Sequence, residues 1–160
     1  MAELEIIAEP GIPQIRATRE FDAPPELVLR AHTDRELVAQ WLGPRKYRMT
    51  IERWDVRDGG TYRYIHTDDE GNEYAFHGVF HGEPSVDSFV QTFEFEGAPG
   101  HVSLDTLRLE ARDGRTILHV NSVFQSVEAR DAMLGSGMAE GMTDTYSRLD
   151  ELLAAQRVEA

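Results

Sequence analysis

The 160-residue chain contains no cysteine, and this absence excludes disulfides, thiolate metal sites and a cysteine nucleophile together. Basic residues are also scarce, since 16 Lys and Arg stand against 29 Asp and Glu, giving a formal net charge of −13. Nucleic acid and anionic membranes attract clustered Lys and Arg, so we expect neither as a partner. The only lysine, Lys46, lies in the polar run Pro44-Arg45-Lys46, which does not favour Schiff-base chemistry.

Long apolar runs are missing as well. No stretch of about 18 apolar residues occurs, so no membrane-spanning helix is predicted. The opening Met1-Ala2-Glu3-Leu4-Glu5 lacks the basic start of a secretory signal, and we therefore expect a cytoplasmic protein. With 41% hydrophobic and 9% aromatic residues the chain has enough apolar side chains for a core, and its length fits one domain.

Turn signals and hydrophobic periodicity predict the order of the elements. We expect a strand over 14–20, two short helices over 21–32 and 33–41, six strands between 46 and 124, and a helical segment over about 127–156. Connections this short join antiparallel strands. Thr33-Asp34-Arg35-Glu36 has capping-box spacing, which predicts Thr33 as the cap of the second helix. The turn signals are Asp58-Gly59-Gly60, Asp68-Asp69-Glu70-Gly71-Asn72, Glu83-Pro84-Ser85, Gly97-Ala98-Pro99-Gly100 and Asp113-Gly114.

Alternation along the predicted strands places aromatic side chains on one face of the sheet. The inward positions are Tyr62, Tyr64, His66, Tyr74, Phe76, Gly78, Phe80, Phe89, Gln91, Phe93, Phe95, Leu118, Val120, Ser122 and Phe124. A single sheet buries its apolar face against a helix, here the C-terminal stripe of Met138, Met142, Thr145, Leu149 and Leu152. Gly135, Gly137 and Gly141 interrupt that helix. Small residues opposite large rings either interlock with them in a packed core or leave a cavity, to which methionines would give an adaptable wall.

The order of several motifs resembles the START-like (SRPBCC) superfamily. These motifs are Phe21-Asp22-Ala23-Pro24, Glu26-Leu27-Val28, Thr33-Asp34, Trp41-Leu42-Gly43-Pro44, Asp55-Val56-Arg57-Asp58-Gly59-Gly60, Gly78-Val79-Phe80, Gln91-Thr92-Phe93 and Gly137-Met138-Ala139-Glu140-Gly141-Met142 with Tyr146 and Arg148-Leu149. Within the superfamily the chain resembles the branch named after the activator of the heat-shock-protein-90 ATPase, through that activator's second domain.

The resemblance implies an α+β helix-grip fold, with a seven-stranded antiparallel sheet wrapped around a long C-terminal helix. Two short helices would lie between the first two strands, and a pocket between sheet and helix. The domain would cover residues 14–155, with an N-terminal extension over 1–13 and a C-terminal tail over 156–160. Because there is no room for the activator's separate N-terminal domain, a chaperone partner is not expected. Self-association is left open.

Other chemistries find little support in the sequence. His77 and His81 share a face, but their parity is opposite to Phe76 and Phe80, so we expect them outside and predict neither a metal nor a cofactor. The Gly135-Ser136-Gly137 run lacks the strand-to-helix setting of a hydrolase nucleophile. Asp68-Asp69-Glu70 is expected to be a solvated turn, and Arg108 to lie outside.

We therefore predict a protein that binds a hydrophobic or aromatic small molecule between the sheet and the C-terminal helix. His66 is either a satisfied core histidine or a polar anchor. The alternatives are a cyclase- or hydrolase-like enzyme that uses the same pocket, with His66 as its ionisable group, and a chaperone-interacting module. The predicted ligand-binding residues are Tyr62, Tyr64, His66, Phe76, Gln91, Phe93, Phe95, Met138, Met142 and Tyr146.

Overall fold

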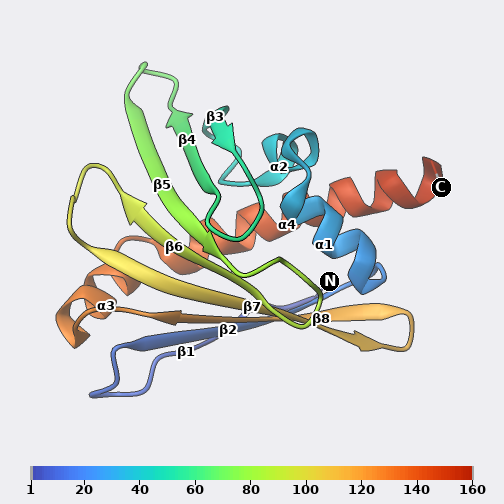
Figure 1. Ribbon diagram of the computed structural model, residues 1–160, viewed down its shortest axis with the longest axis horizontal. Coiled ribbons are helices and arrows are strands. Elements are labelled where there is room, and N and C mark those ends of the chain that lie inside the picture. The colour runs from blue at the N-terminus through green and yellow to red at the C-terminus, as the bar shows by residue number, and fades with distance from the viewer. Residues whose placement is uncertain (1, 160) are drawn as a thin grey trace.

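The computed structural model describes residues 2–159 of the chain and the side chains of residues 2–157. Within that part, one antiparallel sheet of eight strands has the order β1-β2-β8-β7-β6-β5-β4-β3 (Figure 1). The strands are β1 (Glu5–Ile7), β2 (Gln14–Phe21), β3 (Arg48–Trp54), β4 (Thr61–Thr67), β5 (Glu73–His81), β6 (Phe89–Phe95), β7 (Val102–Arg112) and β8 (Arg115–Val123). The helices are α1 (Pro25–Thr33), α2 (Arg35–Trp41), α3 (Val127–Leu134) and α4 (Met138–Glu159). The α+β class and the antiparallel sheet are confirmed.

The predicted number of seven strands is wrong, because the first residues of the chain add an eighth strand at the sheet edge. Strand β1 pairs with β2, with Glu5 opposite Thr18 and Ile7 opposite Arg16. Gly11, in the turn between them, has a positive φ of 79° that reverses the chain. The prolines around this glycine exclude helix, but they are compatible with a turn that leads into an edge pair.

The two short helices lie where the sequence predicts them, but the cap of the second differs. Asp34, and not Thr33, accepts the backbone N–H of Glu36, at 2.9 Å. Thr33 is still inside the last turn of α1, where its hydroxyl donates to the Leu29 carbonyl at 3.2 Å. The cap therefore moves by one residue, because α1 extends one residue further than 32.

The C-terminal helical segment is divided into two helices, whereas the sequence predicted one. Ser126 caps α3 by accepting the backbone N–H of Ala129. Gly137 has a φ of 84°, a conformation that L side chains rarely adopt, and it separates α3 from α4. None of the described helices is both long and apolar enough to cross a membrane.

Helix α4 crosses one face of the sheet, which we call the inner face (Figure 1). Leu149 and Leu153 of this helix pack with Phe21 and Leu118 of the sheet in the main hydrophobic core. A second cluster, formed by the buried Tyr62, Tyr64, Phe80 and Phe89, lies on the inner face of β4, β5 and β6, and Leu29 of α1 packs against it.

Candidate functional site

A ladder of four aromatic rings crosses the inner face of the sheet. Tyr62 stacks on Tyr64 with ring centroids 5.9 Å apart, Tyr64 on Phe76 at 5.2 Å, and Phe76 on Phe93 at 5.4 Å. The alternation along β4, β5 and β6 brings them together, because residues of one parity point to one face. Phe95 contacts Phe76 at 5.2 Å and continues the ladder at its edge. The predicted aromatic face therefore exists as a connected set of rings.

The ladder is buried at one end and accessible at the other. Tyr62 and Tyr64 are buried, whereas Phe76, Phe93 and Phe95 are only partly buried. Complete burial of an aromatic side chain is favourable by about 1.5–3 kcal/mol. Covering the exposed part of these rings with an apolar ligand would therefore be favourable. The rings of Phe76, Phe93 and Phe95 can therefore contact a ligand or solvent.

His66 lies against the ladder in a closed environment. Its ring stacks on Tyr47 with centroids 5.4 Å apart, and it contacts Tyr64 and Phe76. Nε2 has no hydrogen-bond partner within the described residues, and a Cβ on Gly43 would lie 2.5 Å from it. Burial first, and the Arg148 guanidinium second, lower the pKa of His66 to about 4, so the ring is neutral at pH 7.

A polar row lies beside the ladder; the sequence predicted two of its members, Gln91 and Ser122, on the inner face, but not Asp105. Asp105 of β7 is opposite Gln91 of β6 and Ser122 of β8. Ser103 donates a hydrogen bond to Asp105 Oδ1 at 3.1 Å. The sequence does contain a signal for Asp105. Along β7, Asp105 has the same parity as Leu107 and Leu109, and residues of one parity lie on the same face of the sheet.

The predicted residues of α4 lie in two different environments. Tyr146 is fully packed in the main core, edge-on to Phe21 at 5.5 Å and stacked on Trp41. Met142 is partly buried against the same core, and Met138 is partly buried at the start of the helix. Tyr146 and Met142 thus belong to the main core cluster, and the rings of the ladder belong to the second.

The family model of the activator of Hsp90 ATPase homolog 1-like proteins matches residues 22–154 of this sequence. The chain belongs to this family. The matched range includes the aromatic ladder, the polar row and most of α4. No curated protein shows significant sequence similarity to the chain.

Solved structures agree with the assignment to the activator-homologue-like family. A Rhodobacter sphaeroides protein is 30% identical, covers 96% of this chain and 99% of its own, and superposes with a TM-score of 0.87. An Arthrobacter aurescens protein is 25% identical over 94% of this chain and 91% of its own, with a TM-score of 0.86. The AHSA1 protein from Silicibacter pomeroyi, 21% identical over 89% of this chain and 99% of its own, shows the same fold with a TM-score of 0.72. The START-like fold is that of a ligand-binding type of domain.

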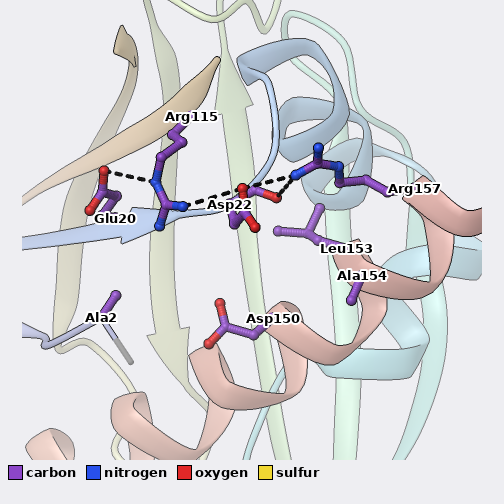
Figure 2. Close-up of a pocket in the computed structure, with 8 residues that line it drawn as sticks. All are labelled: Ala2, Glu20, Asp22, Arg115, Asp150, Leu153, Ala154 and Arg157. Atoms are coloured by element: carbon purple, nitrogen blue, oxygen red, sulfur yellow. Dashed lines mark hydrogen bonds and ion pairs between the residues drawn. The ribbon is translucent and has the colours of Figure 1, made fainter. Parts of the chain in front are cut away.

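A surface pocket of about 520 Å³ lies at the other end of α4, and none of the predicted ligand-binding residues lines it. Figure 2 shows that Arg115 and Arg157 pair with the acidic side chains of the pocket, except for Asp150, whose partner is Arg19. Arg115 bridges Glu20 at 3.0 Å and Asp22 at 3.3 Å, and Arg157 pairs with Asp22 at 2.9 Å. The charged side chains that the structure describes in this pocket are therefore already paired within the activator-homologue-like domain.

The outer face carries the histidines that parity predicted there. His77 contacts Glu96 through Nδ1 at 2.9 Å and Glu94 through Nε2 at 3.5 Å, while His81 is exposed. In the part of the chain that the structure describes, no three His, Asp or Glu side chains are arranged to hold a metal ion. Arg108 is exposed, as the sequence predicted.

The inner face thus combines two chemical capacities. The accessible rings of Phe76 and Phe93 can stack on an apolar or aromatic body. The Gln91–Asp105–Ser122 row beside them can hydrogen-bond to a polar group. We call these five residues the inner-face site.

Proposed function

We propose that this activator-homologue-like protein binds a hydrophobic or aromatic small molecule at the inner-face site, on the face of the sheet that α4 crosses. One observation carries the proposal: Phe76 and Phe93 remain partly accessible in a ring cluster whose other members, Tyr62 and Tyr64, are buried. Ligand sites in proteins combine apolar walls with a few polar groups, and in the inner-face site the rings of Phe76 and Phe93 lie beside three polar side chains.

The position of α4 supports the same proposal. Gly141 faces Pro44, with 3.7 Å between a Cβ at that glycine and the proline ring. Arg148 fixes the helix to the end of α2 and to the loop that follows it. Its guanidinium donates to the carbonyl of Gly43 in the loop at 2.6 Å and to that of Gln40 in α2 at 2.8 Å. The helix is therefore held at a set place over the sheet, and the flexible side chains of Met138 and Met142 at its start can adapt to what lies beneath.

A neutral fluorescent probe, N-phenyl-1-naphthylamine, tests the proposal. We expect saturable binding by the wild-type protein, seen as increased probe fluorescence. Met142→Glu, which places a charge on the inward side of α4, is expected to weaken binding by about tenfold or more, because an ion is costly to desolvate beside an apolar ligand.

The neighbouring residue provides the matched control. Thr143 is exposed, so Thr143→Glu adds the same charge to the same helix turn on its outer side and is expected to bind the probe within about twofold of wild type. Thermal unfolding of both variants shows that they are folded. Absence of saturable binding by the wild type, or an equal loss in both variants, would contradict the proposal.

A further inference from the structure

Asp105 occupies the centre of the inner-face site. It lies on β7 between Ser103 and Leu107 of the same parity, and its neighbours across the sheet are Gln91 and Ser122. Ser103 donates a hydrogen bond to it at 3.1 Å, and the Ser122 and Gln91 side chains lie close enough to stabilise its charged form. Three neutral polar groups on three strands therefore surround the carboxylate.

No cation among the described residues balances this carboxylate. Within the described part of the chain, Asp105 forms no ion pair, whereas Asp150, which also faces the sheet, is paired with Arg19 through two contacts of 2.7 and 2.6 Å. Burial raises the pKa of Asp105, and the three polar groups oppose this rise. Burying an acidic side chain without a cationic partner lowers the stability of the fold. A neutral polar side chain could form the same hydrogen-bonded cluster without this cost, so the acid is not explained by the structure of the cluster alone.

The carboxylate is enclosed but not sealed. Protein atoms surround Asp105 on nearly every side, yet Asp105, Gln91 and Ser122 all keep accessible surface. Its charge also reaches the tyrosines on both sides of the site: burial, and then Asp105, raise the pKa of Tyr64 and of Tyr146. The Asp105 carboxyl group is thus partly accessible and lies close to aromatic rings of the inner face.

A protonated amine is the group that this arrangement fits. An ammonium donates charge-assisted hydrogen bonds to a carboxylate and is attracted to the faces of aromatic rings, so both Asp105 and the neighbouring rings would bind it. A carboxylate or phosphate would be repelled by Asp105, and a neutral hydroxyl would gain only an ordinary hydrogen bond.

The geometry points to Asp105 as the anchor for a protonated amine, so that the inner-face site selects ligands with an aromatic or apolar body and an ammonium group. This inference rests on the proposed function and adds the ligand's charge to it. The aromatic ladder binds the body of the ligand, and Asp105 sets which polar group accompanies it.

Three probes of one shape test this selectivity by isothermal titration calorimetry at pH 7.5. They are 1-naphthylmethylamine, which is cationic, 1-naphthylmethanol, which is neutral, and 1-naphthoate, which is anionic. We expect the wild-type protein to bind the amine at least about tenfold more tightly than the alcohol, and the anion most weakly. Asp105→Asn keeps the shape and removes the charge, and it is expected to abolish the preference for the amine while the alcohol binds within about twofold of its wild-type affinity.

An exposed aspartate separates this local effect from the attraction of any cation to a chain of net charge −13. Asp87→Asn removes the same charge from an exposed loop and should leave the preference for the amine unchanged, with about 0.15 M salt present to screen distant charges. If the alcohol binds and no preference for the amine is found, the inference is wrong while the proposed function stands. If no probe binds, both are wrong. If Asp105→Asn weakens the amine and the alcohol equally and lowers the unfolding temperature, Asp105 is only structural, which also overturns the inference.

Discussion

The burial of His66 predicts a specific loss of stability in mild acid. In the unfolded chain its pKa is close to the ordinary value of 6.5, and in the folded protein it is about 4. Between these two values the unfolded chain takes up a proton that the folded protein does not, so stability is complete above pH 6.5 and falls as the pH decreases towards 4.

The size of the effect follows from the two pKa values. Their difference, 6.5 − 4, corresponds to about 3 kcal/mol when the full range is crossed, at about 1.4 kcal/mol for each pH unit. Between pH 7.5 and pH 5 the same two values give a loss of about 2 kcal/mol from His66 alone. His32 is also buried and its pKa is also lowered, so the whole protein should lose more than this.

Urea unfolding measured by tryptophan fluorescence at several pH values isolates the contribution of His66. His66→Leu removes the titrating ring. Between pH 7.5 and pH 5 the free energy of unfolding of this variant should therefore decrease less than that of the wild type, and the two decreases should differ by about 2 kcal/mol. His101→Leu is the control, because His101 is exposed, and its pH dependence should follow the wild type. If the curves of wild type and His66→Leu run parallel from pH 7.5 to pH 5, the reasoning is refuted, whatever their absolute difference.

Two further predictions concern the packing around α4. Gly43→Ala should lower the free energy of unfolding by about 2 kcal/mol or more, because the backbone has a φ of 98° and the new Cβ would lie 2.4 Å from Cε1 of His66. Gly59→Ala, with a φ of 78° but no atom within 4 Å, should cost only about 1 kcal/mol; equal losses in urea unfolding would contradict the close contact. Arg19→Met should destabilise by about 2–4 kcal/mol, because it leaves Asp150 unpaired, and Arg19→Met with Asp150→Leu should recover most of that loss. If the double variant is no more stable than Arg19→Met in the same assay, the pair does not act as described.

Much of the fold could be predicted because its signals are local. Asp113-Gly114, with φ values of 52° and 78°, forms the two-residue turn that sets Arg112 opposite Arg115 in the hairpin of β7 and β8. The break in the C-terminal helical segment could not be placed, because the sequence shows several glycines there. Gly135, the C-cap of α3, keeps a right-handed backbone conformation with a φ of −76°, whereas Gly137 takes the left-handed conformation. Strand β1 was missed because three residues carry too little alternation, and only pairing with β2 makes them a strand.

The candidate site was predictable on its apolar side and at Gln91, but not at Asp105. Alternation correctly placed Tyr62, Tyr64 and Phe76 on the inner face, since buried aromatics in strands follow a simple period of two. Asp105 was missed because an acidic residue in a strand is ordinarily solvated, and the groups that hold it come from two other strands besides its own. Tyr47, which stacks on His66, comes from the segment before β3, where no periodicity could place it.

The most direct test of the central claim is the location of a bound aromatic molecule. Nuclear Overhauser effects between N-phenyl-1-naphthylamine and methyl or aromatic protons of the protein give that location in solution. The account predicts contacts to the methyl group of Met142 and to the ring protons of Phe76 and Phe93. Contacts confined to Leu153 and Ala154, which line the surface pocket at the other end of α4, would contradict it.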